Sequence, residues 1–315
     1  MTANQQSYTD ADLGALLPLP KADHNKYSRG RVSIIAGSRR YAGAALLATL
    51  AATRSGAGYV TLATTASAAA AARVQAPTVP VLELPEDEEA SGGIFADDTV
   101  AYDVRELTIH SDAVLIGPGL GRDRDLMALV RELVIDLAAT ADSDNKKPAI
   151  VLDADALFAF SGEHLDALPR EYPIVLTPHS GELERLLSAH EPVKAIDEAV
   201  AGGCVFVAKG PRTTIWASRS AVTEEGAPSS LATAGSGDVL AGIITALLAQ
   251  GLEASQAALL GVRLQTKAAL AATADKTPLC MNARDLIDYL PVAAGMLLKA
   301  AGGDKEYACA GGIRQ

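Results

Sequence analysis

The chain alternates short apolar, β-branched runs with longer segments of helical periodicity. Six runs have the composition of buried strands: residues 32–36, 59–63, 113–116, 149–153, 174–177 and 204–208. Helical segments follow most of them, at 43–53, 124–139, 181–188 and 238–249, with a hairpin-like stretch at 214–223. Because continuous apolar strands that alternate with helices form parallel sheets covered on both faces, the sequence predicts a three-layer α/β/α fold around a mainly parallel central sheet.

No change of composition marks a linker, so we expect one domain over residues 1–315. Residues 1–23 and 302–315 are expected to be peripheral, the second segment because it lacks apolar periodicity. The acidic stretch 86–93 is predicted to be a solvated surface loop. Aromatic residues make up only 4% of a chain rich in alanine, which predicts close packing of helices through small side chains.

The overall charge and the absence of recognisable targeting signals limit the partners. A formal net charge of −11 disfavours non-specific binding to nucleic acid or to an anionic membrane. The longest apolar stretch, 42–52, is shorter than the ~20 residues that span a bilayer. The cysteines, Cys204, Cys280 and Cys309, form no CxxC pattern and indicate reduced thiols. We therefore expect a cytoplasmic protein that acts on small molecules.

A glycine-rich turn precedes the last predicted helix. Gly235, Ser236 and Gly237 form a candidate anion hole, because glycines permit close approach to the backbone and the N-terminus of a helix favours negative charge. Asp238 follows directly, so a carboxylate stands where an anion is expected. The residues alone leave two interpretations of Asp238: a helix cap, or a base beside a bound phosphate.

Other polar residues follow predicted strands, where ligands of α/β sheets bind. The turn at 117–121 departs from the GxGxxG dinucleotide motif because Arg122 replaces the third glycine. It is either a structural turn or a close approach to a ligand. His179 and Glu182 stand near a helix start, where His179 is either incidental or a ligand contact and Glu182 can serve a capping role.

Three further segments also admit two interpretations. Lys209 and the residues up to Thr213 either reach a nucleotide phosphate or form a basic hairpin turn. Asp153 and Asp155 either bind Mg²⁺ through water, or Asp155 is only a helix cap. The segment 37–44 has the look of a ligand loop, in which two arginines, Arg39 and Arg40, are positioned to steer an anion.

The order of these segments resembles that of the ADP-dependent NAD(P)H-hydrate dehydratases of the ribokinase-like superfamily. The resemblance extends from about residue 24 to about 290. Its segments are 29–38, 41–44, 54–58, 117–121, 152–157, 177–183, 209–210 and 231–242. The glycine-rich turn is shared by the whole superfamily, whereas PHSGE at 178–182 and DADAL at 153–157 narrow the resemblance to the dehydratases. Tyr27 departs from the family pattern, which usually has glycine there.

The resemblance implies a ribokinase-like fold and a repair reaction. Such enzymes dehydrate the S-epimer of NADHX or NADPHX, the hydrated forms of NADH and NADPH, and convert ADP to AMP and phosphate. Asp238 would be the catalytic base, and its position at a helix N-terminus predicts a low pKa. Ala44, Gly119 and His179 would contact the hydrated dinucleotide together with Asp238. The nucleotide would be bound by Lys209, Gly210, Pro211, Arg212, Thr213 and Gly237.

The resemblance also implies Mg²⁺ with the nucleotide, although it assigns no metal ligands. It further implies a homotetramer and a separate NAD(P)HX epimerase, since only about 31 residues precede the first strand and an epimerase domain is not expected in this chain. The alternative function is an ATP-dependent kinase of hydroxymethylpyrimidine, hydroxyethylthiazole or a sugar. A non-catalytic nucleotide-binding module is disfavoured, because Asp238 and its glycines are all present.

Overall fold

The computed structural model describes residues 4–5, 7–87, 92–140, 147–217 and 220–303. Its strands form one ten-stranded sheet in the order β1-β10-β9-β8-β7-β6-β5-β2-β3-β4. From β8 to β4 neighbouring strands are parallel, and β9 is antiparallel to both β8 and β10. The strands are β1 Asn4–Gln5, β2 Arg31–Ile35, β3 Tyr59–Thr65, β4 Val81–Leu84, β5 Ala113–Ile116, β6 Ala149–Leu152, β7 Ile174–Leu176, β8 Val205–Ala208, β9 Thr213–Ala217 and β10 Ser220–Glu224.

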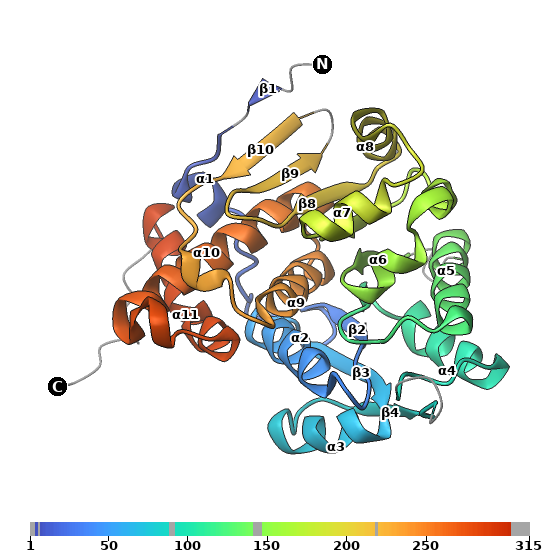
Figure 1. The fold of residues 1–315 in the computed structure, drawn as a ribbon. Coiled ribbons are helices and arrows are strands. Elements are labelled where there is room, and N and C mark those ends of the chain that lie inside the picture. The colour runs from blue at the N-terminus through green and yellow to red at the C-terminus, as the bar shows by residue number, and fades with distance from the viewer. Residues whose placement is uncertain (1–3, 6, 88–91, 141–146, 218–219, 304–315) are drawn as a thin grey trace.

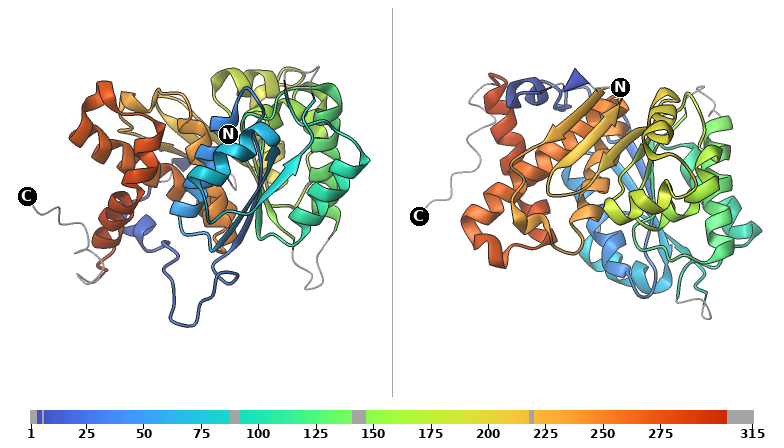
Figure 2. Two further views of the ribbon diagram at one scale, coloured as in Figure 1. Left: turned by 90° about the horizontal axis from the view of Figure 1, so that it is seen from below. Right: turned by 45° about the horizontal axis from the view of Figure 1, so that its top comes forward.

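Helices cover both faces of the sheet and complete the three layers (Figures 1 and 2). One layer contains α1 Asp10–Gly14, α2 Ala42–Arg54, α3 Ala66–Gln75, α9 Ser236–Ala249, α10 Ala254–Cys280 and α11 Ala283–Ala300. The other contains α4 Asp98–Ile109, α5 Arg124–Ala139, α6 Asp155–Ala159, α7 Ser180–Leu186 and α8 Pro192–Ala201, with the 3₁₀ turn η1 Gly162–Ala167. A second 3₁₀ turn, η2, spans Ser229–Leu231. The predicted mainly parallel α/β architecture is confirmed.

Small side chains allow α2 and α9 to pack closely together in one of the two helical layers. A Cβ atom on Gly242 would lie 2.3 Å from the carbonyl oxygen of Ala48, so the two helix backbones approach as closely as glycine allows. Every residue of α9 from Val239 to Ala249 is buried. This packing holds the start of α9, and with it the glycine-rich turn, at a fixed place against α2.

All six predicted strands and the four predicted helices are present, within two residues at each end. The prediction omitted β1, β4, α1, α4, α6, α8 and the two long C-terminal helices, α10 and α11. Helix α10 contains a break at Thr277, whose φ of 69° is in the left-handed region and which precedes Pro278. Proline disfavours helical geometry in the residue before it, which explains the break.

Two expectations about surface segments need correction. Leu13, within the segment 1–23, is 1% exposed, and Arg263 of α10 forms an ion pair with Asp10, so this segment belongs partly to the core. In the stretch 86–93, Glu86 accepts hydrogen bonds from Ser67 and Arg39 and is therefore a structural contact rather than a solvated acid. Residues 88–91 and 304–315 lie outside the described residues.

Candidate functional site

The carboxyl-end edge of the sheet gathers most of the predicted site residues. Asp153 directly follows β6, His179 lies three residues after β7, and Lys209 directly follows β8. The start of α9 lies beside them, because a Cβ atom on Gly237 would be 3.0 Å from Lys209 Nζ. The structure thus joins four segments that are separated in the sequence by up to about 85 residues.

Lys209 forms the central ion pair of this cluster. Its ammonium nitrogen lies 2.7 Å from Asp153 Oδ1, and the hydroxyl of Thr177 donates to the same oxygen at 2.7 Å. The side chain of Asp153 is only 1% exposed. Burial by itself would lower the pKa of Lys209, but the carboxylates of Asp153, Glu182 and Asp238 outweigh burial and raise it. Lys209 is therefore a fixed positive charge.

The turn before α9 has the backbone geometry of an anion site. Gly235 is left-handed, with φ of 88°, and a Cβ atom there would lie 2.4 Å from Leu47 Cδ1, so only glycine fits. The hydroxyl of Ser236 donates to the carbonyl of Leu231 at 2.9 Å, so it is engaged within the turn. The N-cap residue of α9 is Gly235, which has no side chain to cap the helix. The first-turn amides of α9 thus lack a side-chain acceptor, as an anion-binding helix start requires.

Asp238 differs from the sequence prediction in its pKa. Burial, together with the carboxylate of Asp153, raises the pKa of Asp238 to about 7 against the opposing charge of Lys209. The prediction of a low pKa from the helix N-terminus was wrong, because desolvation and neighbouring acids outweigh the helix end. Within the described residues no group donates a hydrogen bond to its carboxylate, and Asp238 does not cap α9. The cap interpretation is thereby disfavoured and the base interpretation favoured.

The raised pKa of Asp238 predicts a pH dependence for any reaction in which it acts as the base. Only the ionised carboxylate accepts a proton, so kcat/KM is expected to rise about tenfold per pH unit below pH 7 and to level off above it. The measurement is the kcat/KM profile of the free enzyme from pH 5 to 9. A profile that is flat down to pH 5 would contradict this assignment.

His179 lies at the N-cap of α7. Its Nδ1 accepts hydrogen bonds from the backbone amides of Gly181 and Glu182, at 3.1 and 3.3 Å, while the Glu182 carboxylate accepts from the amide of His179 at 2.8 Å. The predicted capping role of Glu182 is confirmed. Because Nδ1 is an acceptor, the ring proton of neutral His179 is on Nε2, and the side chain is exposed toward solvent. Nε2 lies 3.3 Å from Glu182 Oε1, and the predicted contact of His179 with the substrate stays a prediction.

Gly119 and Ala44, both predicted to contact the dinucleotide, lie side by side. A Cβ atom on Gly119 would be 3.0 Å from Ala44 Cβ and 2.7 Å from Tyr41 Cβ, and the φ of Gly119 is 66°. A Cβ atom on Gly117 would lie 1.8 Å from the carbonyl oxygen of Asp153. The structural interpretation of the 117–121 turn is thus supported at Gly117, and the turn also brings Gly119 to the predicted substrate residues.

The segment from Lys209 to Thr213 forms the turn between β8 and β9. The sequence left a hairpin turn and a nucleotide contact as alternatives, and the hairpin is present. Gly210, Pro211 and Arg212 are exposed, so they are accessible to a ligand at the same edge of the sheet. Their contact with a nucleotide stays a prediction.

Asp155 is not the helix cap that was considered for it from sequence. It accepts hydrogen bonds from the backbone amide of Gly121 at 2.9 Å and from Arg122 Nε at 2.7 Å, and it is not the cap of α6. Its carboxylate therefore anchors the glycine turn after β5. No local sequence pattern indicates this contact, because the partners are 33 and 34 residues apart.

The acidic residues do not form a ready magnesium cage. No group of three or more His, Cys, Asp or Glu side chains with metal-binding geometry occurs in the described ranges. Asp153 is held by Lys209 and Thr177, and Glu182 by His179. No metal ligand is therefore assigned among these side chains.

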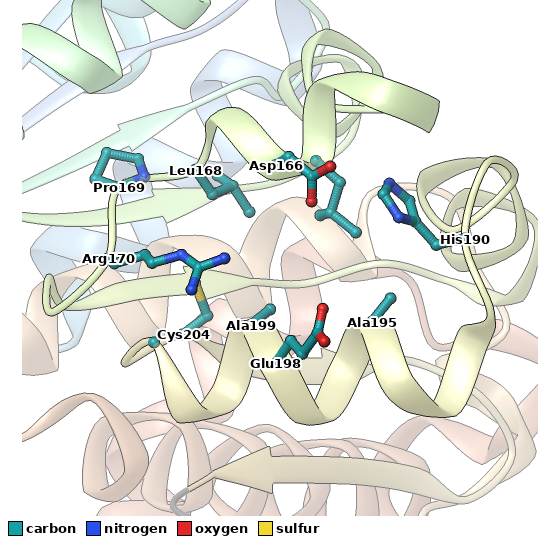
Figure 3. A pocket seen from close by; sticks show the side chains of 11 residues that line it. Asp166, Leu168, Pro169, Arg170, His190, Ala195, Glu198, Ala199 and Cys204 are labelled. Atoms are coloured by element: carbon teal, nitrogen blue, oxygen red, sulfur yellow. The ribbon is translucent and has the colours of Figure 1, made fainter.

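A separate small cavity lies at the opposite edge of the sheet, between η1 and α8 (Figure 3). Arg170 and Cys204, which line it, precede β7 and β8 rather than follow them. Burial raises the pKa of the Cys204 thiol to about 12, which makes it unreactive at neutral pH. None of the predicted site residues lines this cavity, so it is not the candidate site.

Within the described residues no helix has the length and apolar character needed to cross a membrane.

A family model described as NAD(P)H-hydrate dehydratase matches residues 32–292. The bifunctional NAD(P)H-hydrate repair enzyme Nnr of Salinibacter ruber is 38% identical over 91% of this chain and 52% of its own length. The ADP-dependent (S)-NAD(P)H-hydrate dehydratase of Lactococcus lactis is 34% identical over 77% of this chain and 81% of its own. This chain thus spans about half the length of the first of these relatives.

The fold matches that of the ADP/ATP-dependent NAD(P)H-hydrate dehydratase from Bacillus subtilis, whose crystals were grown with ATP and Mg²⁺. The TM-score is 0.70 at 26% identity, covering 93% of this chain and 99% of the other. The expected ribokinase-like fold is confirmed. With a family model that matches most of its length and relatives that are 38% and 34% identical over the aligned residues, this chain belongs to the NAD(P)H-hydrate dehydratase family.

Proposed function

We propose that the protein dehydrates the S-epimer of NADHX and NADPHX in an ADP-dependent reaction that releases AMP and phosphate. The observation that carries the proposal is the placement of Asp238 beside Lys209 and an uncapped helix start. This arrangement offers a base, a positive charge and free backbone amides at one point. The names of the relatives support the substrate and the nucleotide.

The proposed chemistry expels a poor leaving group by converting it to a better one. Asp238 accepts the proton of the ring hydroxyl while the β-phosphoryl group of ADP is transferred to that oxygen, leaving AMP. The amides of Gly235–Gly237 and the ammonium of Lys209 hold the transferring phosphate and oppose its charge. Cleavage of the C–O bond then releases phosphate, and loss of a proton from the adjacent carbon restores the ring double bond.

The ligand contacts follow the same arrangement. We propose that Ala44, Gly119 and His179 contact the hydrated dinucleotide, and that the exposed turn from Lys209 to Thr213, with Gly237, contacts the nucleotide. The proximity of Gly119 to Ala44 and of Gly237 to Lys209 supports this division into two subsites. Mg²⁺ would enter with the nucleotide, whose phosphates supply its oxygen ligands.

The remaining features rest on the family resemblance. We propose a homotetramer, a cytoplasmic location where NADH and NADPH are regenerated, and a separate epimerase that supplies the S-epimer. The continuous ten-stranded sheet supports a single dehydratase domain for the described residues.

The direct test is recovery of reduced-nicotinamide absorbance at 340 nm. Hydrated NADH or NADPH is incubated with the protein, Mg²⁺ and either ADP or ATP, and AMP release is measured in parallel. Absorbance is expected to return with ADP, with one AMP formed per reduced nicotinamide. No return with either nucleotide would refute the proposal. Phosphorylation of hydroxymethylpyrimidine, hydroxyethylthiazole or a sugar would instead support the kinase alternative.

A further inference from the structure

Two arginines lie against one aromatic ring near the proposed dinucleotide site. The guanidinium carbon of Arg122 is 5.4 Å from the ring centroid of Phe158, and that of Arg185 is 5.9 Å from the same centroid. Both distances are within the range of cation–π contacts. We call Arg122, Phe158 and Arg185 the arginine cluster. It places two like charges together in a chain whose net charge is −11.

The arginine cluster has an unbalanced positive charge. Arg122 is paired with Asp155 at 2.7 Å, which also fixes its guanidinium in place. Arg185 is exposed and has no ion-pair partner among the described residues. The phenyl ring holds its side chain without neutralising it. Both guanidiniums thus lie against one ring, at 5.4 and 5.9 Å from its centroid, and the charge of Arg185 is available to a ligand.

The cluster lies at the same edge of the sheet as the candidate site. Arg122 is three residues beyond Gly119 in the turn after β5, and Phe158 is on α6, the helix that follows β6. Arg185 is on α7, six residues after His179, which places it about 9 Å farther along the helix. Helices α6 and α7 are neighbours (Figure 1). A ligand that touches Gly119 and His179 and extends outward between these helices meets the cluster.

We propose that the arginine cluster binds a phosphate group of the hydrated dinucleotide, distant from the reacting ring. This inference rests on the proposed function. Paired guanidiniums suit phosphate because they donate several hydrogen bonds in a fixed plane. Two phosphate sources fit this chemistry: the 2′-phosphate, which only NADPHX carries, and the diphosphate bridge, which both substrates carry. In either case the role of the cluster is in substrate binding rather than in proton transfer, and it discriminates between the two substrates only if the bound group is the 2′-phosphate.

The test uses the full chain and the variant Arg185→Met, which keeps the length of the side chain and removes its charge. Arg105→Met is the control, since it removes one exposed arginine near the end of α4, the helix that leads into the start of β5 and so to the opposite edge of the sheet. For each protein KM and kcat are measured with NADHX and with NADPHX. Binding of the products NADH and NADPH is followed by their fluorescence, which needs no turnover.

Arg185→Met is expected to raise KM for NADPHX and Kd for NADPH about tenfold, with kcat within twofold of wild type. If KM for NADHX and Kd for NADH are unchanged, the bound group is the 2′-phosphate. If KM and Kd rise equally for both coenzymes, the bound group is the diphosphate. Arg185→Lys should recover part of the loss because it retains the charge. Affinities equal to those of Arg105→Met for both coenzymes would overturn the inference. Lack of turnover and coenzyme binding by the wild type would instead refute the proposed function.

Discussion

Asp238→Asn is expected to lower kcat by about 10³-fold while the fold and ADP affinity stay close to wild type. Asparagine has nearly the same shape as aspartate but cannot accept the hydroxyl proton, and positioned general bases contribute about 10²–10⁴-fold to rate. The measurement is the single-turnover rate with NADHX and saturating ADP, alongside ADP binding by calorimetry. The variant should also lose the inflection near pH 7 that Asp238 gives to kcat/KM.

The stability of Asp238→Asn separates the base from a structural role. Because the pKa of Asp238 is about 7 in the folded protein and near 3.8 when unfolded, the folded state binds the proton more tightly. The contribution of Asp238 to the free energy of unfolding of the wild type therefore declines as pH rises from about 4 to 7. Above pH 7 this contribution remains at its lower value. Asparagine lacks this decline, so the variant should be roughly 1–3 kcal/mol more stable than wild type at pH 8. A variant that is destabilised at pH 8 would instead support the helix-cap interpretation.

Lys209→Met is expected to lower the free energy of unfolding by about 3–5 kcal/mol and to remove nearly all activity. The change leaves the buried carboxylate of Asp153 without its ion-pair partner, and removing one member of a buried pair is strongly destabilising. It also removes the charge that opposes the upward shift of the Asp238 pKa, so the base would be more protonated at neutral pH. Urea denaturation and the pH profile of kcat/KM measure the two effects.

The double variant Lys209→Met with Asp153→Asn is the matched control. Asparagine retains an oxygen that accepts from Thr177 but carries no charge, so the double variant should be more stable than Lys209→Met alone. Its activity should stay low, because the ammonium beside Gly237 is still missing. If the loss of stability in the double variant equals the sum of the losses in Lys209→Met and Asp153→Asn, the two residues are not coupled.

The secondary structure was predictable where local patterns are strong. Continuous apolar runs identified the six parallel strands at the centre of the sheet, and periodicity gave α5 with its observed ends. The C-terminal helices α10 and α11 escaped prediction, although Asn282 and Asp285 form a capping box at the start of α11. The terminal segment 1–23 gave no sign of burial, because Leu13 is covered by helices more than 240 residues away in the sequence.

The sequence by itself determined the α/β fold, the glycine-rich turn and the set of polar residues that follow the strands. These depend on apolar periodicity, on backbone freedom at glycine and on the rule that parallel strands end at one edge. Only the tertiary structure decided what those polar residues do. The pKa of Asp238 rises because Asp153 and burial act on it together, and Lys209 is fixed by a carboxylate 56 residues away. Electrostatic energy depends on distance and desolvation in space, and neither can be read from the spacing of residues along the chain.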